Sequence, residues 1–293
     1  MKKIQRKYLP GSEWIYIKIY AGNKTIERIL NEDISIIINK LKKKSLLEKW
    51  FFVRYSDPDF HLRVRFLSKD KRNSGQIIEI INNRLIKLVN CELIWKIQID
   101  TYNRELERYK FELIEDAESI FFTDSECILS ILKKTRNNEN YRWMIALKLI
   151  DVFLSDFLFD TEKKQKLFVS LSKSFKDEFG FNEFNAKQFN SKFRENKNTI
   201  ESVLNNNIIE KDFINLCKPI NKRSKELKSI IKKLNCKIES SKESEVIDSL
   251  LPSYIHMMMN RLFINKNRMH ELILYDFLRR YYTSENIKAK NTK

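Results

Sequence analysis

The sequence is poor in glycine, proline and cysteine, with four of each among 293 residues. So few glycines leave no Gly-rich loop for phosphates and no Gly-x-Ser-x-Gly elbow, which argues against ATP hydrolysis, dinucleotide chemistry and hydrolase triads. The cysteines stand singly, so they resemble neither a zinc ribbon nor a disulfide framework. The three histidines form no metal-binding cluster either. We therefore predict that the protein needs no metal and no cofactor.

Long hydrophobic runs are also absent. The basic start at residues 1–7 is not followed by an apolar stretch, so it does not resemble a signal peptide. Runs such as Ile36–Ile38 are far too short to cross a bilayer. We predict a cytoplasmic protein without membrane association, and 293 residues that are 42% hydrophobic suit one compact domain or two closely packed subdomains.

The formal net charge of +17 is large. Such a charge is typical of proteins with an anionic partner, such as a nucleic acid or an acidic peptide. The lysines are spread over several predicted helix faces, however, and the abundance of Lys, Asn and Ile matches AT-rich codon usage. We attribute most of the charge to this composition and keep the anionic partner as an alternative.

The first hundred residues alternate between apolar and polar positions in a way that predicts strands. Within residues 14–20 every odd position is isoleucine, which is typical of a half-buried strand. The predicted order is strand 14–20, helix 25–43, strand 50–55, turn 57–59, strand 61–66, helix 75–89 and strand 93–102. This β-α-β-β-α-β order predicts an α+β protein with a ferredoxin-like antiparallel sheet and both helices on one face.

The two faces of this sheet differ in character. The isoleucines of the first strand, with Leu62, Val64 and Phe66, are expected to face the helices. The opposite face is expected to be a solvent face or a docking floor, not a second core. Its predicted residues are Trp14, Tyr16, Lys18, Tyr20, Arg54, His61, Arg63, Arg65, Lys96, Gln98, Asp100 and Tyr102.

After Tyr102 the pattern is helical almost to the end of the chain. A helix start is predicted at Thr123-Asp124-Ser125-Glu126, where side chains could cap free amides. Another is predicted near Pro252-Ser253, with proline in the first turn. We predict a sheet subdomain at 1–110 and a helical subdomain at 111–293, packed together as one family domain.

Basic side chains form the first candidate site. His61, Arg63 and Arg65 share one side of a strand because side chains alternate with a period of two, and Arg54 is expected beside them on the adjacent strand. Clustered guanidinium groups suit carboxylates, enolates and phosphates, to which they donate parallel hydrogen bonds. The alternative is an ion-pair network with Asp100 and Glu105.

Two further candidate groups lie on predicted helical turns. Glu105 and Arg108 are three residues apart and share a face, which indicates a surface salt bridge or part of the basic site. His256 and Asn260 are four residues apart, so they share a helix face. On this largely apolar helix His256 is either a satisfied core residue or a proton shuttle.

Several segments, in this order, resemble the C-terminal elimination domain of class I lantibiotic dehydratases, which is also found as free-standing thiopeptide-type bacteriocin biosynthesis proteins. The matching segments are residues 14–22, 50–58, 61–66, Tyr102 with Glu105, Arg108 and Tyr109, residues 117–125, and His256-Met257 with Asn260-Arg261-Leu262. In the family, Gly-Gly usually follows the Arg-Tyr pair, whereas Lys110-Phe111 stand here.

This resemblance implies a lyase that acts on a ribosomally made precursor peptide. A separate domain or protein would first glutamylate Ser or Thr using glutamyl-tRNA, and this chain would then remove glutamate to leave dehydroalanine or dehydrobutyrine. By the family's pattern, Arg63 or Arg65, together with Arg108, would hold the enolate and the glutamyl carboxylate. His256 would move the proton and Glu105 would orient the arginines. The implied substrate-binding residues are Arg54, His61, Tyr102, Asn260 and Arg261.

Two alternatives remain. A thiopeptide cyclase of similar fold would join two dehydroalanines in a formal [4+2] cycloaddition that builds a pyridine or piperidine ring. A non-catalytic protein would use the basic face to bind a peptide or RNA. The expected partners are the precursor peptide and a glutamylating subunit, and the resemblance also allows a homodimer.

Overall fold

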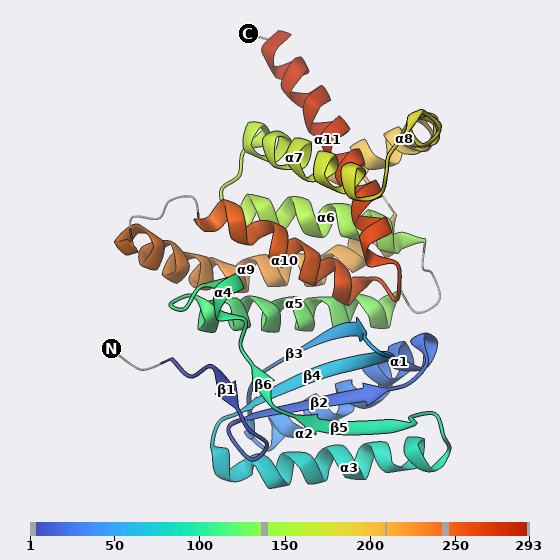
Figure 1. Ribbon diagram of the computed structural model, residues 1–293. Coiled ribbons are helices and arrows are strands. Elements are labelled where there is room, and N and C mark those ends of the chain that lie inside the picture. The colour runs from blue at the N-terminus through green and yellow to red at the C-terminus, as the bar shows by residue number, and fades with distance from the viewer. Residues whose placement is uncertain (1–3, 136–139, 209, 242–245, 292–293) are drawn as a thin grey trace. The chain divides into compact units, whose positions relative to one another are not determined.

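The computed structural model describes residues 4–135, 140–208, 210–241 and 246–291 (Figure 1). The chain forms two compact units, the first made of residues 1–133 and 232–250 and the second of residues 134–231 and 251–293. Within the described ranges, no helix is long and apolar enough to cross a membrane.

The first unit is built on a four-stranded antiparallel sheet with the strand order β3-β4-β2-β5. Its strands are β2 (Trp14–Tyr20), β3 (Leu47–Ser56), β4 (Phe60–Ser68) and β5 (Lys96–Asp100). A separate two-stranded sheet joins β1 (Lys7–Tyr8) to β6 (Tyr102–Asn103). The predicted α+β class, with a small antiparallel sheet near the N-terminus and a helical part after it, is confirmed.

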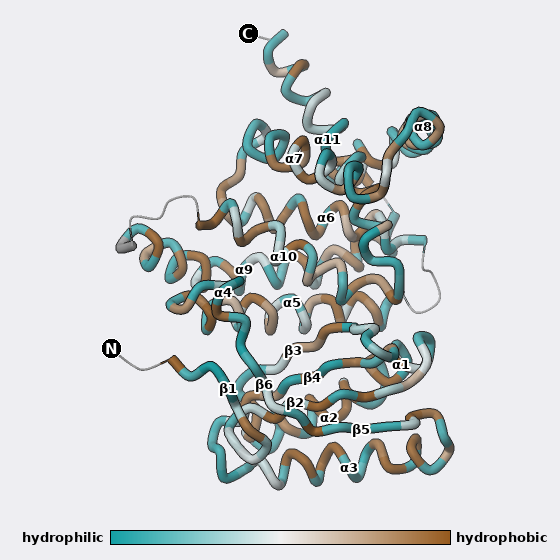
Figure 2. The backbone as a smooth tube through the Cα atoms, in the orientation of Figure 1, coloured by the Kyte–Doolittle hydropathy of each residue, from teal (hydrophilic) through white to brown (hydrophobic). Residues whose placement is uncertain are grey.

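One face of the sheet is covered by the helices that connect its strands. These are α1 (Asn23–Ile29), the π-helical η1 (Leu30–Ile34), α2 (Ser35–Lys43) and α3 (Ser74–Asn90), which follows the short η2 (Lys71–Asn73). Ile15, Ile17 and Ile19 of β2 are buried, as are Leu62 and Val64 of β4. Apolar positions recur along α3 in Figure 2, which is the pattern of a helix with one buried face. Ile19 pairs with Leu62, and Leu62 pairs with Arg54, whose side chain reaches Glu27 of α1. The isoleucines therefore face the helices, as predicted.

The opposite face contains an aromatic core. Tyr102 of β6 packs edge-on against Trp14, with ring centroids 5.2 Å apart, and against Phe51 at 6.1 Å. Phe121 lies 5.5 Å from Phe51, and all four rings are buried. The expectation that this face carries no second core is therefore wrong. Large aromatic rings bury enough apolar surface to form a core even between charged neighbours.

Helix α5 (Ile114–Lys134) follows the single-turn α4 (Leu106–Tyr109) and lies along the outer edge of β3 (Figure 1). The backbone N–H of Phe52 donates to Ser125 Oγ at 3.3 Å, and Lys49 Nζ donates to Ser119 Oγ at 2.9 Å. Because of this packing, α5 belongs to the first compact unit, which therefore extends beyond the predicted sheet subdomain at 1–110.

The predicted helix start at residues 123–126 is wrong, since these residues lie inside α5. Thr123 and Ser125 donate to the carbonyls of Ile120 and Phe121 in the preceding turn. Hydroxyl side chains can satisfy themselves in this way within a helix, so the sequence signal for a cap was misleading.

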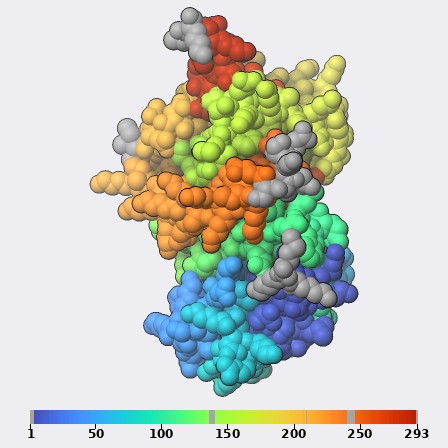
Figure 3. All heavy atoms as spheres, turned by 90° about the vertical axis from the view of Figure 1, so that its left-hand side faces the viewer, coloured from blue at the N-terminus to red at the C-terminus, as the bar shows by residue number. Residues whose placement is uncertain are grey.

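The second unit is helical. It contains α6 (Tyr141–Asp156), α7 (Thr161–Glu178), α8 (Glu183–Leu204), α11 (Asn267–Asn291) and most of α9 (Lys211–Ser241) and α10 (Val246–Leu262). Helices α7 and α11 pack through aromatic pairs, of which Phe168 and Tyr282 are stacked at 5.9 Å. Pro252 lies inside α10, so the predicted helix start there is also wrong. Figure 3 shows the surface of the molecule from a second direction.

Candidate functional site

Arg65 of β4 lies among three aromatic rings on the face away from α1 to α3. Its guanidinium carbon is 4.4 Å from the ring centroid of Tyr16, 4.8 Å from that of Tyr102 and 5.2 Å from that of Phe51. The buried Nε atom of Arg65 has no hydrogen-bond partner. Aromatic faces attract a cation but leave its N–H donors unused. The three rings thus fix the half-buried guanidinium without accepting its N–H groups.

Arg63 lies two residues earlier on the same face and is fixed by His61. The Arg63 Nε atom donates to His61 Nε2 at 3.0 Å, and its guanidinium carbon lies 3.4 Å from the ring centroid of Tyr55. Because His61 Nε2 accepts a hydrogen bond, its proton is on Nδ1, which donates to the Asp59 carbonyl at 2.7 Å. Burial lowers the pKa of His61, and the charge of Arg63 lowers it further. His61 is therefore a neutral acceptor that orients Arg63.

The carboxylates expected to neutralise these arginines have other partners. Asp100 accepts from Lys18 Nζ at 2.5 Å, and this hydrogen bond holds the pKa of Asp100 below its usual value. Glu105 pairs with Arg108 at 3.4 Å. Within the part of the chain that the structure describes, neither Arg63 nor Arg65 forms an ion pair with a carboxylate. These two arginines therefore do not form the predicted alternative, an ion-pair network with Asp100 and Glu105.

Arg54 does not belong to this face. It pairs with Leu62 in the β3–β4 register, so its side chain points to the helix side of the sheet. There its guanidinium is buried and forms an ion pair with Glu27 of α1 at 3.1 Å. The prediction that Arg54 lies beside His61 is wrong, because the β3 residues on the arginine face are Phe51, Val53 and Tyr55.

Tyr102 is held over Arg65 by a buried polar network. Its hydroxyl donates to Glu118 of α5 at 2.9 Å. Arg104 donates to both oxygens of Glu118, at 2.7 Å and 2.6 Å, and to the Gln5 carbonyl at 3.2 Å. Burial and the Glu118 charge raise the pKa of Tyr102 well above its usual value, so it stays a donor.

Neither Glu118 nor Arg104 was predicted from the sequence as a site residue. The sequence did contain a signal for Glu118. It is a charged residue between Ala117 and Ile120-Phe121, on a helix face that is otherwise apolar. Charged residues are rarely fully buried unless they are paired.

The Glu105–Arg108 pair is at the surface, as its spacing predicts. Glu105 precedes the first residue of α4 and Arg108 lies in its only turn. Lys110, the first residue after α4, has φ of 63° and ψ of 145°, a conformation that favours glycine. This lysine occupies the position where the family usually has the first of two glycines.

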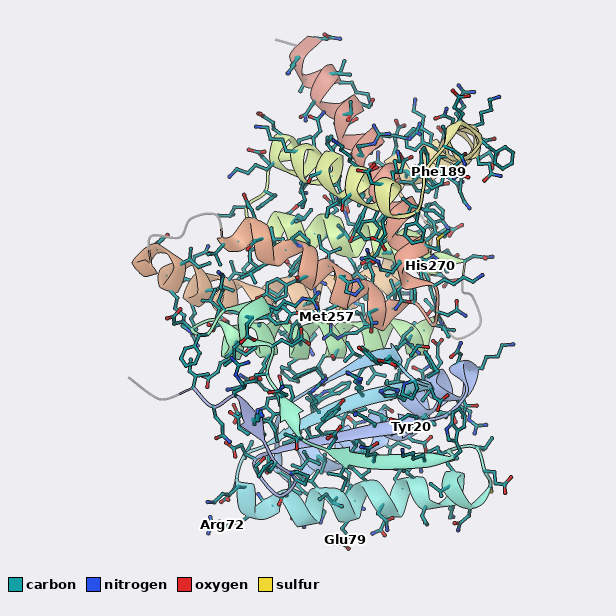
Figure 4. The ribbon with its side chains drawn as sticks, in the orientation of Figure 1. Tyr20, Arg72, Glu79, Phe189, Met257 and His270 are labelled. Carbon is teal, nitrogen blue, oxygen red and sulfur yellow. The ribbon has the colours of Figure 1, made fainter. Side chains whose placement is uncertain are left out.

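In the second unit, His256 of α10 is bound to a buried carboxylate. Its Nδ1 atom lies 3.0 Å and 3.1 Å from the two oxygens of Glu271 in α11. Glu271 is fully buried and also accepts from the Tyr275 hydroxyl at 3.3 Å. In the described ranges Nε2 of His256 makes no hydrogen bond. Figure 4 labels Met257, the next residue on this helix.

Sequence reasoning missed Glu271, although its position directly before the apolar run Leu272-Ile273-Leu274 was a usable signal. Asn260 lies one turn after His256, and Arg261 is fully buried in the same unit. The predicted site residues therefore fall into two groups, one in each unit. The first unit contains His61, Arg63, Arg65, Tyr102, Glu105 and Arg108, and the second contains His256, Asn260 and Arg261.

A groove of about 470 Å³ lies at the Trp14 end of the sheet. Its lining mixes both charges and includes Lys49, Lys69, Arg104 and Glu118. None of the predicted site residues lines it, so it is separate from the arginine pair.

The first unit thus carries a basic sheet face with Arg63 and Arg65, and the second unit carries the pair of His256 and Glu271. The family model of the lantibiotic biosynthesis dehydratase C-terminal region matches residues 14–282. The chain belongs to this family.

Relatives by sequence are longer than this chain. The nisin biosynthesis protein NisB of Lactococcus lactis subsp. lactis is 30% identical over 96% of this chain and 26% of its own length. The epidermin biosynthesis protein EpiB of Staphylococcus epidermidis is 25% identical over 86% of this chain and 24% of its own length. The chain thus spans about a quarter of these relatives.

Solved structures share the fold. The tRNA-dependent lantibiotic dehydratase MibB from Microbispora sp. 107891 superposes with a TM-score of 0.75 at 18% identity, over 96% of this chain and 29% of that one. The pyridine synthase TbtD from thiomuracin biosynthesis superposes with a TM-score of 0.65 at 13% identity, over 93% of this chain and 98% of that one. TsrL superposes with a TM-score of 0.68 at 13% identity, over 94% and 96% of the two chains.

Proposed function

We propose that this chain eliminates glutamate from glutamylated Ser or Thr residues of a ribosomally made precursor peptide and leaves dehydroalanine or dehydrobutyrine. The observation that carries the proposal is the pair Arg63 and Arg65. These cations share one sheet face and form no ion pair with a carboxylate in the described part of the chain. Such a pair favours anions, and the reaction produces two of them.

The elimination breaks the Cα–H and Cβ–O bonds and forms a base–H bond and the π bond between Cα and Cβ. A base takes the α-proton, the electrons of the C–H bond form the Cα=Cβ double bond, and the Cβ–O bond breaks to release glutamate as a carboxylate. A proton next to an amide carbonyl is only weakly acidic, so most of the acceleration comes from stabilising the enolate. Arg65 suits this role because aromatic rings fix its position without using its donors. Arg63, held by His61, is suited to the same role.

His256 is the proposed proton acceptor. Glu271 holds the proton on Nδ1, which leaves Nε2 as the basic atom. When Nε2 takes a proton, the buried carboxylate of Glu271 stabilises the positive ring, as a carboxylate does for the histidine of a catalytic triad. Glu271 is thus a positioning residue. In the first unit, Arg108 would bind the glutamyl carboxylate and Glu105 would orient Arg108, which fits their observed pairing.

The partners in this proposal are a precursor peptide and a glutamylating protein or domain that uses glutamyl-tRNA, with the reaction taking place in the cytoplasm. The direct test is to incubate the chain with a precursor peptide that carries glutamyl esters on Ser or Thr. We expect free glutamate in an enzymatic assay and a matching loss of one glutamate per site by mass spectrometry. Glutamyl adducts that persist unchanged would refute the proposal.

A [4+2] cyclase is the second candidate. The observation in its favour is that this chain covers nearly the whole length of TbtD, a pyridine synthase, and of TsrL. A peptide that contains two dehydroalanines separates the candidates. A cyclase would convert it to a ring-containing product, with His256→Ala retaining more activity than variants of the aromatic residues on the arginine face, whereas we expect the peptide to be recovered unchanged.

A further inference from the structure

Asp276 of α11 binds three cations at once. Its carboxylate is fully buried, and the Oδ1 atom accepts from Lys176 Nζ of α7 at 2.6 Å and from Arg279 Nη2 at 3.0 Å. The Oδ2 atom accepts from Arg280 Nε at 2.6 Å. Burial acts to raise the pKa of Asp276, but the hydrogen bond from Lys176 and the charge of Arg280 keep it below its usual value, so the carboxylate is ionised. This Asp276 cluster, which comprises the carboxylate and its three cations, therefore has a net charge of +2.

The excess positive charge of the Asp276 cluster is not neutralised by other acidic residues. In the described ranges each of the three cations forms an ion pair with Asp276 alone. Glu178, two residues after Lys176 in α7, pairs with Arg268 instead. One cation is enough to neutralise a buried carboxylate and to join α7 to α11, whereas three held together repel one another. The arrangement therefore favours a further anion at this place.

The three cations are accessible from solvent and are held in place by aromatic rings. Their side chains are between 19% and 31% exposed. Lys176 Nζ lies 4.7 Å from the ring centroid of Phe181, and the guanidinium carbon of Arg280 lies 5.3 Å from that of Phe193 in α8. The rings attract the cations but accept no conventional hydrogen bond from them. Each cation donates one hydrogen bond to Asp276, and the described residues supply no other acceptor for it.

The charge and the donor groups of the cluster indicate the class of ligand. A phosphate monoester carries close to two negative charges at neutral pH and three acceptor oxygens, whereas a carboxylate carries one charge. Guanidinium groups donate parallel hydrogen bonds to phosphate, and an ammonium adds a point charge. The ring of Phe189, labelled on α8 in Figure 4, lies 5.9 Å from Lys176 Nζ and is partly exposed. Such a ring is a surface on which a nucleobase can stack.

We propose that Lys176, Arg279 and Arg280 form a binding site for a phosphate monoester dianion, carried by a free nucleotide or by the 5′ end of an RNA. Asp276 fixes the three cations, and the phosphate neutralises the charge that Asp276 leaves over. The site lies wholly in the second unit, whereas Arg63 and Arg65 belong to the first. This proposal does not depend on the proposed function.

The first test is a titration of the ¹⁵N-labelled full chain with inorganic phosphate at about pH 8, where the dianion predominates. The side-chain Nε–H signals of Arg279 and Arg280 report binding at this site separately from binding at other arginines. We expect both signals to shift and to saturate. Arg280→Gln, followed at Arg279, should raise the dissociation constant at least about tenfold. Lys288→Gln is the matched control, since it changes the charge equally on the same helix, at the pair with Glu285, and should bind phosphate as the native chain does.

Asp276→Asn provides a test with the opposite sign. It raises the net charge of the cluster to +3, so phosphate should increase Tm more in this variant than in the native chain. If the variant does not fold by itself, phosphate should restore its folding. A cluster that only joins α7 to α11 would lose stability without any response to phosphate, and this outcome would overturn the proposal.

A comparison of ligands identifies the source of the phosphate. Adenosine monophosphate that binds more tightly than inorganic phosphate indicates a nucleotide. A short RNA that binds more tightly still, and only when its 5′ end is phosphorylated, indicates an RNA end. Adenosine that binds as tightly as its monophosphate, signals of Arg279 and Arg280 that do not shift with any of these phosphates, or an unchanged dissociation constant in Arg280→Gln would each overturn the proposal.

Discussion

The Nδ1 atom of His256 lies 3.0 Å from a carboxylate oxygen of Glu271, a side chain that is fully buried. This contact fixes which ring nitrogen carries the proton and leaves the other as a base. The substitution Glu271→Gln keeps the shape of the side chain but removes its charge. We expect kcat for glutamate elimination to fall about 10- to 100-fold with KM nearly unchanged, because the positive ring loses its stabilisation.

The control for this variant is Tyr275→Phe, which removes the weaker 3.3 Å bond to the same carboxylate and keeps the buried ring. Its activity should stay within a few-fold of the native enzyme. The ¹⁵N spectrum of His256 should show one tautomer in the native chain and a mixture in Glu271→Gln. A single tautomer in both would contradict the positioning role.

The rate of elimination should fall even when Arg65 is replaced by lysine. Arg65→Lys keeps the charge but loses the planar donors that match an enolate or carboxylate. We expect elimination to slow by about 10²- to 10³-fold, the effect of losing one oxyanion donor, and glutamylated peptide to accumulate by mass spectrometry. Arg72→Lys, at an exposed pair with Asp70, is the matched control and should behave as the native chain.

The buried pair of Arg104 and Glu118 should support the stability of the first unit. Arg104→Ala leaves the Glu118 carboxylate buried without its main partner, and we expect a loss of about 3–5 kcal/mol in the free energy of unfolding. Urea denaturation followed by fluorescence measures it. The double variant Arg104→Met/Glu118→Leu, which removes both charges, should be less destabilised than the single one, and an equal loss would count against this account.

Lys110 is a position where glycine should stabilise the chain. Its φ of 63° costs conformational free energy for any residue that has a Cβ atom. We expect Lys110→Gly to stabilise the fold by about 1 kcal/mol, seen as a rise in Tm. Lys110→Val should lower Tm, because branching at Cβ makes this conformation worse. A lower Tm for the glycine variant would contradict the argument.

His61 should make stability depend on pH. Burial lowers its pKa in the folded chain, whereas the unfolded chain titrates at about 6.5. The unfolded state therefore binds more protons below that value, so the stability linked to His61 is full above about pH 6.5 and falls as the pH drops further. His61→Gln should show a smaller loss of Tm between neutral and acidic pH than the native chain.

Local patterns predicted the sheet and its helices well, because isoleucine at every second position of β2 can face only one way. They failed for β3, where Trp50-Phe51-Phe52-Val53 is apolar on both faces and no alternation assigns Arg54 to a side. The sequence marks Glu118 and Glu271 as charged residues among apolar ones, but it does not pair them with Tyr102 and His256. Glu118 and Glu271 reach them through packing between different elements, which spacing along the chain does not encode.

The hydrogen bond from Arg63 to His61 gives this protein a built-in spectroscopic reporter. An anion that draws the Arg63 guanidinium toward itself would weaken the bond at His61 Nε2 and change the chemical shift of that nitrogen. Titration with free glutamate, the product of the proposed reaction, could thus be followed at one imidazole without any chromophore. Occupancy of the arginine face would be visible in the resting protein, before any turnover takes place.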